Sequence, residues 1–137
     1  MSKTFSLNGS LAADTIAVAS LDLCDVRLMN DANYPWLILV PRIADAIEIV
    51  DLEASVRHTL MDEIAKASEA LRAVTGAEKL NVAALGNMVA QLHVHVIARF
   101  RDDEAWPGPV WGAAKPVAYD AGERERLISD LADRLSA

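Results

Sequence analysis

The segment 91–97, which reads Gln-Leu-His-Val-His-Val-Ile, constrains the fold of this chain more than any other. Polar and apolar residues alternate along it, and successive side chains of a β-strand point to opposite faces of a sheet. Gln91, His93 and His95 should therefore share one face, while the apolar residues between them pack into a core. Two of the chain's three histidines lie on this face. Because an imidazole is costly to place on an apolar strand without partners, the pair requires a structural or chemical reason.

Further apolar segments predict the rest of a sheet. Residues 25–30 alternate as a half-buried strand does. Residues 36–41 form a continuous apolar run that ends in a proline, as in a central strand buried on both faces. Short connections between consecutive strands favour antiparallel pairing. We predict five strands, at residues 15–21, 25–30, 36–41, 80–85 and 92–100.

Two helices are predicted beside this sheet. Apolar residues recur at spacings of three and four between Asp51, a candidate N-cap, and Gly76, where a left-handed residue would end the helix. A second helix should follow Asp120, which has capping-box spacing to Glu123. The resulting class is α+β, an antiparallel sheet with one long helix and a C-terminal helix on one face. The other face is then left for a ligand or a partner subunit.

Composition narrows the class of protein. The 137 residues suit a single domain, residues 1–137, with a core at 15–100 and a tail and helix at 101–137. A hydrophobic share of 53% excludes a disordered chain, and a net charge of −7 argues against non-specific nucleic-acid binding. No apolar run reaches the roughly 20 residues of a membrane helix, and no secretory signal is visible. Cys24 is the only cysteine, so no internal disulfide can form. We expect a cytoplasmic protein that binds neither nucleic acid nor membranes.

The histidine pair allows three interpretations. The first is a pair of structural histidines whose ring nitrogens are hydrogen-bonded within the fold. The second is half of a metal site, although the third histidine, His58, lies on the predicted long helix and no HExxH or CxxC motif accompanies the pair. The third is nucleophilic catalysis at phosphorus, in which a neutral imidazole nitrogen attacks and neighbouring donors stabilise the developing charge.

Residues 91–97 also match a known motif, His-φ-His-φ-His-φ-φ with φ apolar, except that Gln91 takes the first place. In this the chain resembles the histidine triad (HIT) proteins. Members of that family bind a nucleotide across the sheet, and the middle histidine attacks the α-phosphorus. The leaving group departs, and water hydrolyses the nucleotidyl-histidine that remains. The resemblance favours the catalytic interpretation and implies a HIT-like fold.

Other positions extend the resemblance over residues 15–100. Asn30 ends a strand and is followed by a proline turn, as in the family, where this place contacts the ribose hydroxyls. Asn81 and Asn87 resemble family side chains that donate to the phosphate, and Arg99 closes the motif strand. The backbone at Gly86 can approach the phosphate closely because glycine has no Cβ.

The resemblance also implies roles for the motif residues. His93 is the expected nucleophile, and His95 is expected to hydrogen-bond a phosphate oxygen. Gln91 can offer an amide donor to the phosphate or leaving group but cannot act as a proton shuttle. The implied substrates are dinucleoside polyphosphates or nucleoside phosphoramidates. The resemblance also implies a homodimer. It implies neither a cofactor nor an obligatory metal.

Three positions depart from the family pattern. Gln91 replaces the first histidine, Trp36 stands where a strand histidine is usual, and Met88 stands where a hydroxyl residue is common. Because general acid–base help is worth about 10²–10⁴-fold, the alternative function is a catalytically weak nucleotide-binding module. Trp36 is expected to pack in the core, and the alternative is that it borders the base pocket together with Tyr34.

The tail and the remaining polar residues are less informative. Trp106 and Trp111 are expected either to attach the tail to the domain or to form an aromatic wall that selects the base or leaving group. Arg99 and Arg101 are expected at a solvated edge. His58 is expected on the surface.

Overall fold

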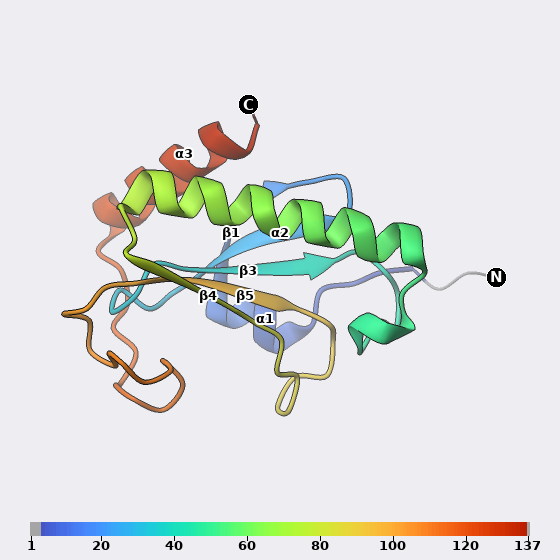
Figure 1. The fold of residues 1–137 in the computed structure, drawn as a ribbon, viewed down its shortest axis with the longest axis horizontal. Helices are drawn as coiled ribbons and strands as arrows, with labels where there is room; N and C mark the ends of the chain where they lie inside the picture. Colours follow the sequence, from blue (N-terminus) through green and yellow to red (C-terminus); the bar gives the residue numbers. More distant parts are fainter. Residues whose placement is uncertain (1–3, 137) are drawn as a thin grey trace.

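The computed structural model describes residues 4–136 and folds them into one five-stranded sheet flanked by helices (Figure 1). The strands pair antiparallel in the order β1-β2-β3-β5-β4. This architecture confirms the predicted α+β class, with one long helix and a C-terminal helix. The strands are β1 (Thr15–Ser20), β2 (Cys24–Met29), β3 (Trp36–Pro41), β4 (Lys79–Ala83) and β5 (Val94–Arg99), and the α-helices are α1 (Gly9–Asp14), α2 (Ala54–Thr75) and α3 (Ala121–Leu135).

The strands agree with the predicted ranges to within two residues at each end. The most informative difference is that β5 begins at Val94, so Gln91 and His93 precede the strand. There the backbone leaves the ladder, and the Leu92 N–H donates to the Ala46 carbonyl at 2.9 Å. All six residues of β5 are buried. Its alternation therefore separates two packed faces of the sheet rather than core from solvent.

The helix ends confirm two predicted signals and correct one. Gly76 ends α2 with a φ of 72°, in the left-handed region, and the Asp120 carboxylate accepts from the Glu123 N–H at the start of α3. The prediction that Asp51 caps the long helix is wrong. Asp51 instead ends a short 3-10 helix, Ile49–Asp51, where its carboxylate accepts from the Glu48 N–H at 3.3 Å. The short helix α1 was not predicted, and Asn8 caps it through its side-chain oxygen.

Helices α2 and α3 cover one face of the sheet, and α1 and the tail lie against the other (Figure 1). On the first face Leu39 and Val96 join the helices in a large aliphatic cluster. On the second face Ile38 and Ile97 join a smaller cluster with Leu11 of α1 and with residues of the tail. The second face is the one that carries the polar side chains of the sequence motif.

One minor prediction is confirmed away from the motif, because His58 is exposed on α2. Cys24 is fully buried. Burial is the main cause that raises the pKa of the Cys24 thiol, and the neighbouring Glu63 carboxylate raises it further. The thiol therefore stays protonated. Among residues 4–136 there is no helix both long enough and apolar enough to span a membrane.

Candidate functional site

His93 and His95 lie together on the face of the sheet opposite α2 and α3. His95 is held in the sheet between Ile38 of β3 and Ala83 of β4, its partners in the strand register. The centroids of the two imidazole rings are 4.9 Å apart, with the rings close to perpendicular. The side chains are largely buried, with 7% of His93 and 4% of His95 exposed. The predicted juxtaposition of the two histidines is therefore present.

The ring of His93 is oriented by its own backbone. Its Nδ1 lies 2.6 Å from the carbonyl oxygen of Gln91. A carbonyl oxygen can only accept a hydrogen bond, so Nδ1 carries the proton in this contact. In the neutral ring, Nε2 then carries the lone pair.

The ring of His95 is enclosed by two tryptophans. The indole Nε1–H of Trp36 donates to His95 Nδ1 at 3.0 Å, and the Trp111 ring meets the imidazole edge-to-face at 5.0 Å. The pKa of His95 is lowered to about 4, mainly because the ring is buried and to a smaller extent because His93 lies nearby. His95 is therefore neutral at physiological pH. Trp36 is buried as predicted, and its polar contact with His95 was not predicted from the sequence.

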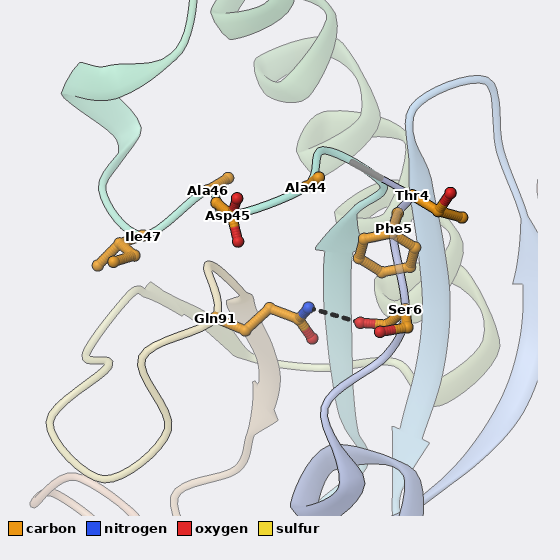
Figure 2. Close-up of a pocket in the computed structure, with 8 residues that line it drawn as sticks. All are labelled: Thr4, Phe5, Ser6, Ala44, Asp45, Ala46, Ile47 and Gln91. Carbon is orange, nitrogen blue, oxygen red and sulfur yellow. Dashed lines mark hydrogen bonds between the residues drawn. The ribbon is translucent and has the colours of Figure 1, made fainter. Parts of the chain in front are cut away.

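Gln91 holds the N-terminal segment of the chain. Its side-chain nitrogen donates to the Ser6 carbonyl at 2.9 Å, and its side-chain oxygen accepts from the Asn8 N–H at 2.8 Å. Figure 2 shows the Gln91 side chain extending toward Ser6, with this segment and the 44–47 loop around it. They enclose a cavity of about 310 Å³. The oxygen and the nitrogen of the Gln91 side-chain amide are thus each hydrogen-bonded to main chain.

Two further cavities lie beside the histidine pair. One of about 500 Å³ is lined by Asn30, Trp36 and Trp111 among others. The other, of about 230 Å³, is lined by Gly86 and His93 and by several apolar side chains. Because Trp36 and Trp111 contact His95, and His95 contacts His93, the imidazole pair connects the walls of the two cavities.

Of the four predicted binding residues, Asn30 and Gly86 line these cavities, whereas Asn81 and Asn87 line neither. Asn30 lines the larger one, and its side-chain oxygen accepts from the Tyr119 N–H at 3.1 Å. Gly86 lines the smaller one and has a φ of 76°, which favours glycine. Asn87 is exposed in the connection between β4 and β5. Asn81 pairs with Ile97, two residues beyond His95, and its side-chain oxygen accepts from Arg99 at 2.7 Å.

The prediction that Arg99 lies at a solvated edge is wrong. Only 2% of Arg99 is exposed, and its Nε and Nη2 donate to the two carboxylate oxygens of Asp103 at 2.8 and 3.0 Å. Nη2 also donates to the Gly108 carbonyl at 2.8 Å. The Arg99 contact lowers the pKa of Asp103 to about 2. Arg101, by contrast, is exposed as predicted, with 79% of its side chain accessible.

The same guanidinium attaches the tail to the sheet. The Trp106 ring lies 5.6 Å from the Arg99 Cζ. The ring of Tyr34, in the turn before β3, lies 5.8 Å from the same atom. The residues that follow bring Trp111 against His95. Trp106 therefore has the attaching role predicted for the tail, while Trp111 forms part of a cavity wall.

The arrangement offers few ligands to a metal ion. Within the part of the chain that the structure describes, no group of three or more His, Cys, Asp or Glu side chains is placed to hold one. His93 and His95 already use their Nδ1 atoms in contacts with Gln91 and Trp36. The metal interpretation thus lacks a third protein ligand among residues 4–136.

Comparison with known proteins places this geometry in a class. A family model described as HIT domain matches residues 10–102, which is more than half of the chain. The chain therefore belongs to the HIT, or histidine triad, family. Proteins of this family are generally nucleotide hydrolases or transferases.

Three solved histidine triad proteins resemble the chain over nearly its whole length. The one from Bradyrhizobium japonicum is 50% identical, with a TM-score of 0.96, covering 97% of this chain and 99% of that one. The one from Marinobacter aquaeolei is 45% identical, with a TM-score of 0.94 and 98% of both chains covered. The one from Sinorhizobium meliloti is 44% identical, with a TM-score of 0.93, covering 96% of this chain and 97% of that one. Among curated proteins no significant match is found.

Proposed function

We propose that the protein is a nucleotide phosphohydrolase or nucleotidyl transferase that cleaves its substrate at the α-phosphate through a covalent nucleotidyl-His93 intermediate. The observation that supports this most directly is the 2.6 Å contact between His93 Nδ1 and the Gln91 carbonyl. It holds the proton on Nδ1 and leaves the lone pair on Nε2. A neutral imidazole nitrogen in this state needs no separate base before it attacks.

The reaction has two steps. First the Nε2 lone pair of His93 forms a bond to the α-phosphorus, and the bond from phosphorus to the leaving oxygen or nitrogen breaks. The leaving group departs with that electron pair and takes up a proton from solvent, and the water that attacks in the second step returns one. Water then attacks the phosphorus, the phosphorus–Nε2 bond breaks, and a nucleoside monophosphate is released with His93 restored. His95 donates to a phosphate oxygen as charge develops on it.

The two cavities beside the histidines suit the two parts of such a substrate. The larger cavity, with Asn30 and two tryptophan rings, suits a nucleoside whose ribose hydroxyls bond to Asn30. The smaller cavity lies at His93 and Gly86, where the phosphate and leaving group would sit. Asn81 and Asn87 are the proposed phosphate donors. For Asn81 this role falls to its amide nitrogen, since its oxygen already accepts from Arg99.

The charges around the site favour one substrate class. Among the described residues that line the two cavities there are Asp14, Asp31 and Glu48 but no Lys or Arg. A polyphosphate leaving group carries several negative charges and would meet carboxylates here. A nucleoside phosphoramidate has a neutral or cationic amine as its leaving group. We therefore propose phosphoramidates as better substrates than dinucleoside polyphosphates.

The decisive experiment replaces the proposed nucleophile. The variant His93→Gly should lose turnover of an adenosine phosphoramidate while still binding AMP in a calorimetric titration. Wild-type protein incubated with a labelled adenylyl donor should carry acid-labile label, and His93→Gly should carry none. The exposed His58→Ala is the matched control and should behave as wild type. Turnover retained in His93→Gly would exclude the covalent mechanism.

A second candidate is a nucleotide-binding module with weak catalysis. The observation that favours it is the place of Gln91, whose amide nitrogen donates to Ser6 and whose amide oxygen accepts from Asn8. An amide in the first motif position cannot transfer a proton to a leaving group. This module would bind AMP in the same titration but accumulate no label and release no product. The labelling experiment thus separates the two functions.

We further propose that the chain acts in the cytoplasm as a homodimer. β4 is an edge strand, and exposed apolar side chains lie on it and after it, with Val82 51%, Leu85 44% and Met88 96% exposed. An unpaired edge beside exposed apolar residues favours association with a second copy. Sedimentation at micromolar concentration should give a dimer, and Val82→Lys should shift it toward monomer.

A further inference from the structure

Trp36 has a polar contact that the proposed reaction leaves without a role. It is the first residue of β3, and only 6% of it is exposed. Its indole nitrogen donates to His95 Nδ1 at 3.0 Å across two neighbouring strands, although the residues are 59 positions apart. Core packing alone would require the ring but not this hydrogen bond.

The chemistry of the indole determines where the His95 proton lies. An indole N–H is a donor and never an acceptor. The nitrogen that faces it must therefore carry a lone pair, which places the ring proton of neutral His95 on Nε2. Rotating the imidazole by half a turn would bring a C–H group against the indole N–H, so the same contact also fixes the orientation of the ring.

His93 is held in the opposite state. Its Nδ1 faces a carbonyl oxygen, which only accepts, so its proton lies on Nδ1. The two touching rings thus present different groups from Nε2: a lone pair on His93 and an N–H on His95. The Gln91 carbonyl, an acceptor, sets the tautomer of His93, and the Trp36 indole N–H, a donor, sets the tautomer of His95.

We propose that Trp36 is a positioning residue that holds the His95 proton on Nε2 and so makes His95 a fixed hydrogen-bond donor toward the substrate. Without this contact His95 can take the other tautomer, whose Nε2 lone pair would repel a phosphate oxygen. The catalytic consequence rests on the proposed function, whereas the tautomer itself does not.

The tautomer is measured by nitrogen-15 NMR of the imidazole nitrogens in the full-length protein without ligand. In wild type, His95 Nδ1 should show the shift of an unprotonated nitrogen and Nε2 that of a protonated one. Trp36→Phe keeps an aromatic ring but removes the donor, and should give averaged shifts that report both tautomers. Trp111→Phe is the matched control, because the Trp111 ring meets the same imidazole through an edge-to-face contact that a phenyl ring can also make, and it should leave the wild-type pattern. A protonated Nδ1 in wild type, or an unchanged pattern in Trp36→Phe, would overturn the proposal.

Turnover tests the catalytic consequence separately. With an adenosine phosphoramidate, Trp36→Phe should lower kcat by about tenfold to a hundredfold, the effect expected from losing one buried hydrogen bond. Trp36→His restores a ring N–H and should recover part of both the NMR pattern and kcat. Should wild type show no turnover at all, the proposed function fails while the NMR result still decides the tautomer. An altered tautomer with unchanged kcat would refute the positioning role.

Discussion

Neighbouring residues of the same strands face two different environments on the two sides of the sheet. Toward α2 and α3, Leu39 and Val96 lie in the large apolar cluster of the core. On the other side Trp36, His95 and Arg99 are nearly as buried, and each is held by at least one hydrogen bond of defined direction. Packing tolerates any side chain of suitable volume, whereas these contacts require a particular donor or acceptor. The helix side therefore serves stability, and the opposite side additionally fixes geometry.

The largest effect should come from breaking the buried ion pair on the site side. Asp103→Asn leaves the Arg99 guanidinium buried without its counter-charge and should lower the free energy of unfolding by about 3–5 kcal/mol. Urea denaturation measures the loss. The exposed pair of Arg101 and Glu78 is the control, and Glu78→Gln should change stability by less than about 1 kcal/mol. Equal losses in both variants would remove the distinction between the pairs.

The adjacent residues Ile38 and Leu39 compare the two faces directly. Both are fully buried on β3, so truncation of either to alanine should cost about 2–5 kcal/mol in the free energy of unfolding. Only Ile38 is the cross-strand partner of His95. Ile38→Ala should therefore also lower turnover per folded molecule, and Leu39→Ala should not. Turnover that falls equally in the two variants would contradict the division between faces.

Acid should destabilise the site side at a defined pH. The pKa of His95 is lowered from 6.5 to about 4, so the unfolded chain takes up this proton first as the pH falls. Stability should therefore decrease between pH 6.5 and about 4, by up to about 3 kcal/mol from this residue. His95→Gln should flatten the curve of unfolding free energy over that interval. Asp103, with a pKa lowered from 3.8 to about 2, acts only at lower pH.

The smallest expected effect concerns the contact of Gln91 with the N-terminal segment. Gln91→Ala removes two hydrogen bonds at a partly exposed position and should cost about 1–2 kcal/mol. Hydrogen exchange of the Asn8 amide should accelerate more than that of amides in β5. Gln91→Glu keeps the acceptor for Asn8 but loses the donor to Ser6, so it should have an intermediate effect. Protection of Asn8 unchanged in Gln91→Ala would show that the contact does not hold this segment.

Local patterns predicted much of the fold because they reflect local physics. The alternation around His93, the apolar run from Trp36 and the left-handed end at Gly76 are each visible within a few residues. The cap was misplaced at Asp51 because a short 3-10 helix, which uses the same capping residues, intervenes before α2. Helix α1 was missed because six residues with a glycine at the start show no periodicity.

The contacts that define the site were hidden because they join distant parts of the chain. Trp36 meets His95 across 59 positions, and Gln91 meets Asn8 across 83. Arg99 was misjudged for a related reason. Its partner Asp103 lies only four positions away, but the partnership exists because the tail folds back over the strand and excludes water. A polar residue at a strand end gives no sign of such a cover.

The anchoring of Ser6 and Asn8 by Gln91 has a consequence for the order in which the molecule is made. Translation starts at the N-terminus, so this segment leaves the ribosome long before the residue that will hold it has been added. Contacts of such separation close late, once the intervening strands are in place. A chain that stops before residue 91 lacks both His93 and the Gln91 side chain that binds Ser6 and Asn8. The His93 imidazole and the neighbouring segment that contains Ser6 and Asn8 therefore reach their final arrangement only after residues 91–93 have been added.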